Sequence, residues 1–326
     1  MSRTLLLIGL VIGTLAVGVA LYLFASLKKN DAPVLHGEVT AHVPFKGDLK
    51  LDLYLPTQQV HEQIPVLVYI HGGAWIAGSK ISVNNARFNG AFNALREAGY
   101  AIVAPDYTLA KLGKTPFPAC IEDAFAALAW VEQEAETYGF DLGNVGLLGE
   151  SAGGHIAMMC TFAKAEDYGQ SLSYEPTYLV DVYGPADLKQ LYYDQVPLVD
   201  SIKQRVERLP EAWQDNFNLP LYLFGFDPAT DAERADSFAS LYSPVQFASA
   251  KAPPILMIHG DEDRVVPHSQ SQLLQAKLEE VGRSYQFQTL EGVDHAFRGA
   301  TEEQKAQVQQ WITDFVLANY QRQIGT

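Results

Sequence analysis

The segment Gly149-Glu150-Ser151-Ala152-Gly153 has the pattern G-x-S-x-G, with a serine between two glycines. It follows an apolar run at residues 145–148 and opens a helix-like segment at residues 152–164. A serine on such a tight strand-to-helix turn is lifted out of the sheet, and the flanking glycines let strand and helix come close. This context favours Ser151 as a nucleophile for acyl transfer over an ordinary glycine-rich turn.

A serine nucleophile needs a base and an acid, and candidates for both follow Ser151 in the chain. Asp263 comes shortly after the apolar run at residues 255–258, and His295 comes shortly after the expected last strand at residues 285–290. We expect His295 to act as the general base, which takes the serine proton and returns it to the leaving group. We expect Asp263 to orient the histidine, with the neighbouring Asp261 as the alternative acid.

The glycine-rich stretch His71-Gly72-Gly73-Ala74-Trp75 follows the apolar run at residues 66–70. Negative charge grows on the carbonyl oxygen during acyl transfer, and backbone N–H groups must already point at it. Small residues let the backbone come close to that oxygen. The expected oxyanion donors are Gly73, Ala74 and Ala152, with Gly72 as an alternative. We expect His71 to brace this loop rather than to take part in the chemistry.

The surrounding sequence alternates between strand-like and helix-like segments. Apolar runs typical of buried parallel strands are residues 66–70, 100–104, 145–148, 178–182 and 255–258. Helix-like segments between and after them are residues 85–98, 119–136, 152–164, 269–281 and 302–320. Residues 49–55 instead alternate leucine with polar residues, which predicts a half-buried antiparallel strand near a sheet edge. The alternation predicts an α/β fold with a mostly parallel sheet covered on both faces.

One segment interrupts this alternation. Residues 187–243 are rich in aromatic side chains and are longer than a simple crossover requires. We interpret them as a cap inserted over the carboxyl ends of the strands. The predicted catalytic domain covers residues 30–326.

The bulk composition excludes some classes of function. The formal net charge is −15 at pH 7, and an acidic surface of this kind repels nucleic acid. Cys120 and Cys160 lie in apolar, helix-like stretches and are expected to be buried free thiols. There is no CxxC or Cys/His cluster, so we expect neither a metal nor an organic cofactor.

The N-terminus has a different character from the rest of the chain. Residues 5–27 carry no charge and are long enough to span a bilayer. We expect residues 1–29 to be an uncleaved, single-pass membrane anchor with the catalytic domain outside the cytoplasm. The alternatives are a cleaved signal peptide, for which Gly18-Val19-Ala20 offers small residues, and a buried helix of the domain itself.

Taken together, these motifs resemble the esterase and lipase family of α/β hydrolases. The nearest branch resembles carboxylesterases related to hormone-sensitive lipase and bacterial BD-FAE-type esterases. The resemblance rests on residues 149–154, 71–75, 259–267 and 294–297, and on a stretch from Asp106 to Asp123. Thr108 departs from it, where the family usually carries arginine, and Ala74 stands in place of the third glycine of the lipase-type loop.

The resemblance implies an α/β-hydrolase fold and hydrolysis of a small-molecule carboxylic ester through an acyl-enzyme. The first expectation for the substrate is a short- to medium-chain ester, and an arylformamide or a polysaccharide acyl group is the second. Two other classes stay open. One is a serine peptidase or amidase, which uses the same triad, and the other is a non-catalytic adhesion or scaffold protein on this fold. The sequence does not determine the oligomeric state.

Overall fold

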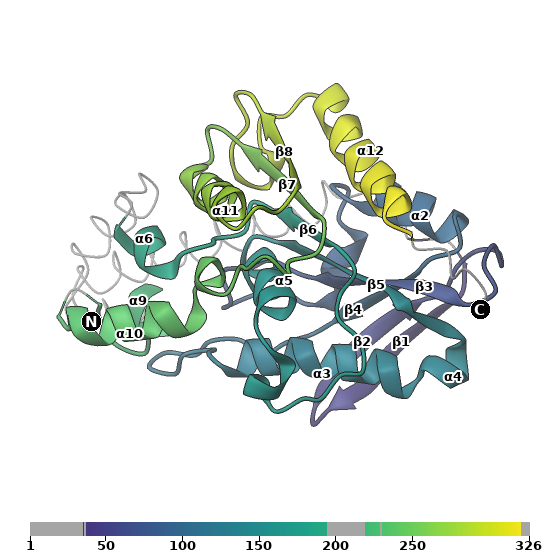
Figure 1. Ribbon diagram of the computed structural model, residues 1–326, viewed down its shortest axis with the longest axis horizontal. Coiled ribbons are helices and arrows are strands. Elements are labelled where there is room, and N and C mark those ends of the chain that lie inside the picture. Colours follow the sequence, from purple (N-terminus) through teal and green to yellow (C-terminus); the bar gives the residue numbers. More distant parts are fainter. Residues whose placement is uncertain (1–34, 36, 194–218, 229, 321–326) are drawn as a thin grey trace, which may run out of the picture.

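An eight-stranded sheet forms the centre of the computed structural model (Figure 1). The structure describes residues 35, 37–193, 219–228 and 230–320. The strands are β1 (Val39–Lys46), β2 (Leu49–Tyr54), β3 (Ile64–Ile70), β4 (Ala101–Pro105), β5 (Phe140–Glu150), β6 (Leu179–Val182), β7 (Ile255–Gly260) and β8 (Tyr285–Leu290). Within the described residues their order in the sheet is β1-β2-β4-β3-β5-β6-β7-β8. This order brings the carboxyl ends of β5, β6 and β7 next to one another.

The pairing of the strands agrees with the sequence patterns. The six strands β4, β3, β5, β6, β7 and β8, which are neighbours in this order in the sheet, run parallel to one another. Strand β2 runs antiparallel to both β1 and β4. The predicted antiparallel strand at residues 49–55 is thereby confirmed. The edge strand β1 was not predicted, because most of its side chains are exposed or only half-buried and leave no apolar alternation.

Helices cover both faces of this sheet, as the alternating pattern predicted. The main helices are α2 (Asn89–Glu97), α3 (Ala119–Gln133), α4 (Ala135–Tyr138), α5 (Ala152–Phe162), α11 (Ser269–Glu280) and α12 (Glu302–Ala318). Val66 and Val68 of β3 pack in the core with α3 and α5, and Leu67 and Tyr69 pack on the opposite face with α2 and α12 (Figure 1). Both faces of β3 are therefore buried, which explains its continuous apolar run.

The two free cysteines lie in this helical layer. Cys120 is in α3 and Cys160 is in α5, and both are buried thiols. Burial raises the pKa of both thiols. The expectation of buried free cysteines is confirmed.

The aromatic segment between β6 and β7 contributes three short helices to the described part of the chain. They are α6 (Leu188–Tyr193), α9 (Leu219–Leu223) and α10 (Ala232–Tyr242), which lie together at the left of Figure 1. The cap boundaries at 187 and 243 stay a prediction, because residues 194–218 are outside the described ranges.

The expected N-terminal anchor cannot be compared with the structure. Residues 1–34 lie outside the described residues. Among the residues that are described, no helix is both long enough and apolar enough to cross a bilayer. The anchor at residues 1–29 therefore stays a prediction.

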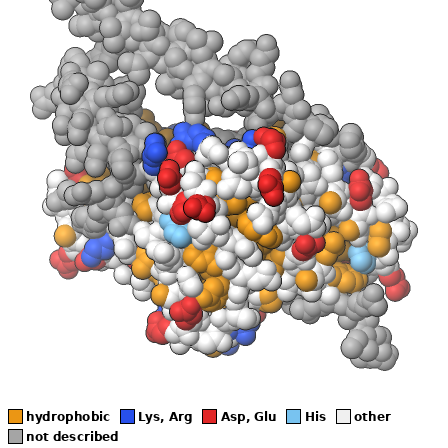
Figure 2. Space-filling view, turned by 90° about the horizontal axis from the view of Figure 1, so that it is seen from above, with side chains coloured by type: hydrophobic (Ala, Val, Ile, Leu, Met, Phe, Trp, Pro, Cys, Tyr) orange, Lys and Arg blue, Asp and Glu red, His pale blue; other side chains and the backbone are white. Residues whose placement is uncertain are grey.

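The outer surface mixes charged and apolar side chains. Figure 2 shows acidic, basic and apolar side chains interspersed over the described part of one face. Single exposed apolar residues of this kind are normal on a folded domain.

One buried carboxyl lies where α5 crosses the sheet. Asp181 of β6 is fully buried, and its Oδ1 accepts a hydrogen bond of 3.1 Å from the Gly184 N–H. A Cβ on Gly154 would lie 2.5 Å from that oxygen, and a Cβ on Gly184 would lie 2.3 Å from it. Burial raises the pKa of Asp181 from its ordinary 3.8 to about 8, against the opposing effect of the Gly184 hydrogen bond.

We predict that Asp181→Asn alters the pH dependence of stability. A carboxyl with a raised pKa in the folded state stabilises the fold most below its ordinary pKa of 3.8, and this stability is lost as the pH rises towards about 8. The free energy of unfolding of the wild type should therefore fall relative to that of the variant by up to about 1.4 kcal/mol per pH unit across this window. Urea unfolding between pH 5 and 8.5 measures the difference, and parallel curves for the two proteins would contradict it.

Candidate active site

Ser151 stands on a strained turn between β5 and α5. Its backbone has φ 54° and ψ −122°, a conformation that residues other than glycine rarely adopt. A Cβ on Gly149 would lie 2.1 Å from the Gly153 carbonyl oxygen, and a Cβ on Gly153 would lie 2.1 Å from the carbonyl oxygen of Ile70. No other residue fits at either position without moving the backbone. The two glycines of the G-x-S-x-G pattern are thus required by the close approach of strand, turn and helix.

The structure brings Ser151, His295 and Asp263 into one hydrogen-bonded row. His295 Nε2 lies 3.1 Å from Ser151 Oγ, and His295 Nδ1 lies 2.7 Å from Asp263 Oδ2. A carboxylate can only accept, so Nδ1 carries the proton and Nε2 is left to accept the serine hydrogen. Asp261 lies outside the row and accepts a hydrogen bond of 2.7 Å from the Gly292 N–H.

Asp263 is held by donors on both of its oxygens. Oδ1 accepts hydrogen bonds of 2.8 and 2.9 Å from the N–H groups of Val265 and Val266. Oδ2 faces His295 and, at 3.3 Å, Nε2 of His259. Burial by itself would raise the pKa of Asp263, but these histidine contacts outweigh it and hold that pKa well below its usual range. Asp263 is therefore an anion throughout the physiological pH range.

The predicted oxyanion loop turns tightly beside the serine. Gly73 has φ 127°, and a Cβ there would lie 2.0 Å from the Ala77 carbonyl oxygen, so only glycine fits. The Gly73 carbonyl accepts hydrogen bonds from the N–H groups of Ile76 and Ala77, which close the turn. Ala74 has a positive φ of 53° and lines the same pocket as Ser151.

The N–H groups expected to bind the oxyanion are available at this turn. Within the described part of the chain, no backbone carbonyl accepts from Gly72, Gly73 or Ala74. Ala152 begins α5, and it lines the pocket together with Ala74 and Ser151. First-turn N–H groups of a helix have no partner within the helix. The choice among these donors stays a prediction.

The His71 side chain packs against the expected oxyanion loop and holds it in place. Its ring is stacked on Tyr107 with 4.2 Å between ring centroids, and Tyr107 donates a 3.0 Å hydrogen bond to the His71 carbonyl. Its Nδ1 lies 2.8 Å from the carbonyl oxygen of Gly72. Burial lowers the pKa of His71. These contacts agree with the bracing role expected from the sequence.

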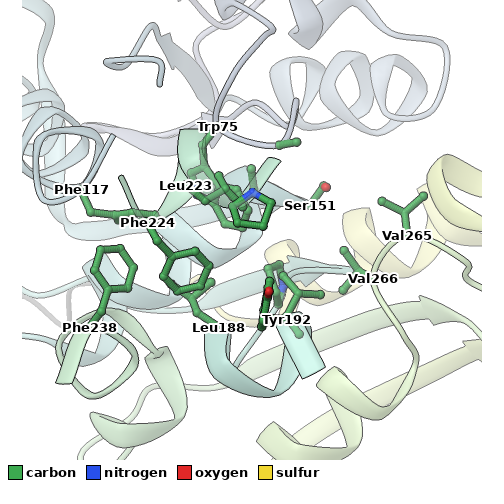
Figure 3. A pocket seen from close by; sticks show the side chains of 15 residues that line it. Trp75, Phe117, Ser151, Leu188, Tyr192, Leu223, Phe224, Phe238, Val265 and Val266 are labelled. Atoms are coloured by element: carbon green, nitrogen blue, oxygen red, sulfur yellow. The ribbon is translucent and has the colours of Figure 1, made fainter. Parts of the chain in front are cut away.

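An apolar pocket opens beside Ser151 (Figure 3). Phe224 and Phe238 lie on one side of the serine, and Val265 and Val266 lie on the other (Figure 3). Leu188, Leu191, Tyr192 and Leu223 of the segment between β6 and β7 complete the wall, with Trp75 and Phe117 from the core of the domain. None of the described lining residues is charged. Such a pocket suits an uncharged, apolar group.

Four further residues around the row were not singled out from the sequence. Glu150, the variable position of the serine motif, pairs with Arg87 at 2.7 Å, and Tyr183 packs on the His295 ring. His259 lies beside Asp263. Glu150 and His259 lie in the motifs of Ser151 and Asp263, but only as neighbours of those residues, and Arg87 and Tyr183 belong to no motif. The spacing of residues in the sequence therefore gave no signal of the contacts that these four residues make.

The titratable side chains do not form a metal site in the described part of the chain. Among these residues no group of three or more His, Cys, Asp or Glu side chains is arranged to hold an ion. The groups that meet at Ser151 are instead a hydroxyl, an imidazole and a carboxylate. This arrangement can activate a serine for attack on a carbonyl carbon.

We predict that Asp263→Asn slows the reaction of Ser151 with a fluorophosphonate probe by about 10⁴-fold, because the amide no longer fixes the histidine tautomer or stabilises the imidazolium. Asp261→Asn is the matched control, since that side chain lies outside the row. Its labelling rate should stay within about twofold of the wild type. Rates are measured by gel fluorescence over time, and equal losses in both variants would contradict the geometry.

The sequence of this chain is similar to those of proteins that are named esterases. The BD-FAE family model matches residues 51–278, which is most of the chain. "Esterase LipQ" of Mycobacterium tuberculosis is 26% identical over 272 residues, covering 80% of this chain and 57% of that protein. "Isoprenylcysteine alpha-carbonyl methylesterase ICME" of Arabidopsis thaliana is 27% identical over 254 residues, covering 76% of this chain and 53% of that protein. The chain thus spans less than two thirds of the length of these relatives.

Solved structures agree on the fold. An esterase from Pyrobaculum calidifontis has a TM-score of 0.66 at 23% identity, with 90% of this chain and 89% of that chain covered. A truncated carbohydrate esterase from gut microbiota has a TM-score of 0.64 at 23% identity, with 88% and 99% covered. At this identity the likeness shows the fold alone. The match of the family model shows the family: the chain has the α/β-hydrolase fold and belongs to the BD-FAE family.

Proposed function

We propose that this protein is a carboxylic ester hydrolase that works through an acyl-enzyme on Ser151. The observation that carries the proposal is the hydrogen-bonded row of Ser151, His295 and Asp263, whose serine lines an apolar pocket. The relatives named esterases support the same chemistry.

The first half of the reaction forms the acyl-enzyme. Ser151 Oγ attacks the ester carbonyl carbon while its proton passes to His295 Nε2, and Asp263 stabilises the imidazolium. The carbonyl oxygen becomes an oxyanion, which Gly73, Ala74 and Ala152 are proposed to bind through their N–H groups, with Gly72 as the alternative. The imidazolium then gives its proton to the leaving alcohol, and the carbon–oxygen bond of the ester breaks.

The second half releases the acid and restores the serine. His295 takes a proton from a water molecule as that water attacks the acyl carbon. The second tetrahedral intermediate collapses, Ser151 Oγ leaves with the proton from His295, and the carboxylic acid departs. Each step uses only protein groups and water.

The pocket supports an ester whose acyl or alcohol part is apolar. Its wall is made largely of aromatic and aliphatic side chains, among them Leu188, Phe224 and Phe238. Burial of an apolar chain against them contributes about 0.8 kcal/mol per methylene group. Short- to medium-chain esters are the proposed substrates.

We also propose a location for the enzyme from the N-terminal sequence. Residues 1–29 would tether the domain to a membrane as a single-pass anchor, with residues 30–326 outside the cytoplasm. The support is the uncharged run at residues 5–27. The catalytic proposal does not depend on this location.

We predict that Ser151→Ala lowers kcat for a p-nitrophenyl acyl ester by about 10⁶-fold, because the nucleophile is lost. The thermal midpoint should stay close to that of the wild type, since alanine removes only the hydroxyl. Loss of covalent fluorophosphonate labelling in the variant is the accompanying readout. Full turnover by a folded Ser151→Ala protein would remove the assignment, and cleavage of peptides without esterolysis would favour a peptidase.

We predict a preference for short and medium acyl chains in a series of p-nitrophenyl esters from C2 to C16. The value of kcat/KM should rise from C2 as methylene groups enter the apolar pocket, and it should fall for the longest chains that the pocket cannot hold. Initial rates below KM measure the series. A flat profile, or a maximum at C16, would contradict the proposed substrate class.

A further inference from the structure

The carboxylate next to the nucleophile is buried and fully engaged. Glu150 Oε1 accepts a 2.7 Å hydrogen bond from the Tyr69 hydroxyl, and Oε2 accepts one of 2.8 Å from the Tyr183 hydroxyl. Arg87 Nη2 reaches both oxygens, at 3.0 and 2.7 Å. Burial by itself would raise the pKa of Glu150, but Arg87 and the two hydroxyls together lower it. Glu150 is therefore an ion paired with Arg87.

The Glu150 side chain of this pair lies next to the expected oxyanion loop. A Cβ placed on Gly72 would lie 3.3 Å from Glu150 Cγ and 3.3 Å from Ser151 Cβ. The Glu150 side chain is only 4% exposed and that of Arg87 is 25% exposed, so water screens their charges weakly. Any imbalance between the two charges would act on the reacting atoms.

Tyr183 links the pair to the general base. Its hydroxyl is bound to Glu150, and its ring lies 4.7 Å from the His295 ring, centroid to centroid, at an interplanar angle of 56°. The residue has a positive φ of 45°, which is uncommon for a tyrosine. Its N–H donates to the carbonyl of Ile258, and its ring also contacts Phe297 edge-on. One tyrosine ring thus separates the Glu150 carboxylate from the imidazole.

The other groups facing His295 and Glu150 have separate roles. Asp263 pairs with His295 itself and with His259, whose ring also packs on Tyr183. The Asp294 side chain accepts a hydrogen bond from the backbone N–H of His295 and pairs with Arg298 at the half-exposed surface. His71 lies near Glu150, and burial lowers its pKa, so it is uncharged at neutral pH. Arg87 is the cation that contacts the Glu150 carboxylate among the described residues.

Building on the esterase function proposed above, we propose that Glu150 and Arg87 form a charge-balanced positioning pair for His295. Glu150 holds Tyr183 against the imidazole. Arg87 cancels the carboxylate charge, which would otherwise favour the imidazolium and oppose the oxyanion. The pair thereby sets the pH range in which His295 can accept the Ser151 proton.

The test uses three variants of the full chain: Glu150→Gln, Arg87→Met and the double variant. Removing only the carboxylate leaves an unbalanced cation, which disfavours the imidazolium. Removing only the guanidinium leaves an unbalanced anion, which favours it. The double variant restores a neutral pair, so the charge effect should disappear. Two readouts are used: the acid limb of the pH profile of kcat/KM for a p-nitrophenyl ester, and the NMR titration of the His295 ring.

The expected shifts have opposite signs. The midpoint of the acid limb should move down by about 0.5 to 1 pH unit in Glu150→Gln and up by a similar amount in Arg87→Met. In the double variant it should return to within about 0.2 unit of the wild type. The maximal kcat/KM should fall about tenfold in Arg87→Met and recover at least in part in the double variant. The NMR midpoints should follow the same order.

The control is Arg264→Met, which removes an arginine next to Asp263 whose side chain is 63% exposed. Solvent screens this charge, so both midpoints should stay within about 0.2 unit of the wild type. An unchanged or raised midpoint in Glu150→Gln, or shifts of one sign in all three variants, would overturn the proposal. Arg87→Met leaves the buried Glu150 carboxylate without its cation, which destabilises the fold, so Glu150→Gln and the double variant by themselves decide the sign. The NMR titration does not require turnover. A failure of the positioning-pair proposal can therefore be distinguished from a failure of the esterase assignment.

Discussion

The close approach of β5, the turn at Ser151 and α5 is the constraint on which the rest of the site depends. The serine backbone keeps a positive φ of 54° only because Gly149 and Gly153 have no side chains to collide with neighbouring carbonyl groups. The N-terminus of α5 is thereby placed beside the hydroxyl, and Ala152 lies at the start of the helix. The same approach puts the oxyanion loop at Gly72 within contact distance of Ser151. The proposed nucleophile and the expected oxyanion donors are thus positioned by one feature of the backbone.

Two buried carboxylates then organise the charges around the row. Asp263 is kept ionised by backbone N–H groups and two histidines, and it faces His295 directly. Glu150 is kept ionised by Arg87 and two tyrosine hydroxyls, and it faces His295 through Tyr183. An unpaired buried charge is costly, so each carboxylate needs its donors. Their different partners give them different proposed roles: Asp263 stabilises the imidazolium directly, whereas Arg87 balances the charge of Glu150.

Much of the fold was predictable because parallel strands buried on both faces form continuous apolar runs. β3, β4 and β7 were found this way, and so was the antiparallel strand at residues 49–55. The edge strand β1 lacked such a run, because its side chains are mostly exposed. The helix expected at residues 119–136 is divided into α3 and α4 at Glu134.

The candidate site was predictable where a motif carries a steric or chemical requirement. Ser151, Asp263 and His295 follow the carboxyl ends of β5, β7 and β8, and these ends lie on one side of the sheet. Arg87 and Tyr183 could not be found, because their contacts with Glu150 and His295 join distant segments without any motif. The pocket wall was foreseen only as an aromatic insertion, since the sequence does not say which of its side chains face the serine.

The most direct test of the central claim is a crystal structure of the protein after reaction with a dialkyl p-nitrophenyl phosphate. Phosphorus should be bonded to Ser151 Oγ, with the phosphoryl oxygen within hydrogen-bonding distance of the N–H groups of Ala152 and of Gly73 or Ala74, or of Gly72 as the alternative. His295 Nε2 should remain next to Ser151 Oγ. An adduct on another residue, or a phosphoryl oxygen turned away from these N–H groups, would contradict it.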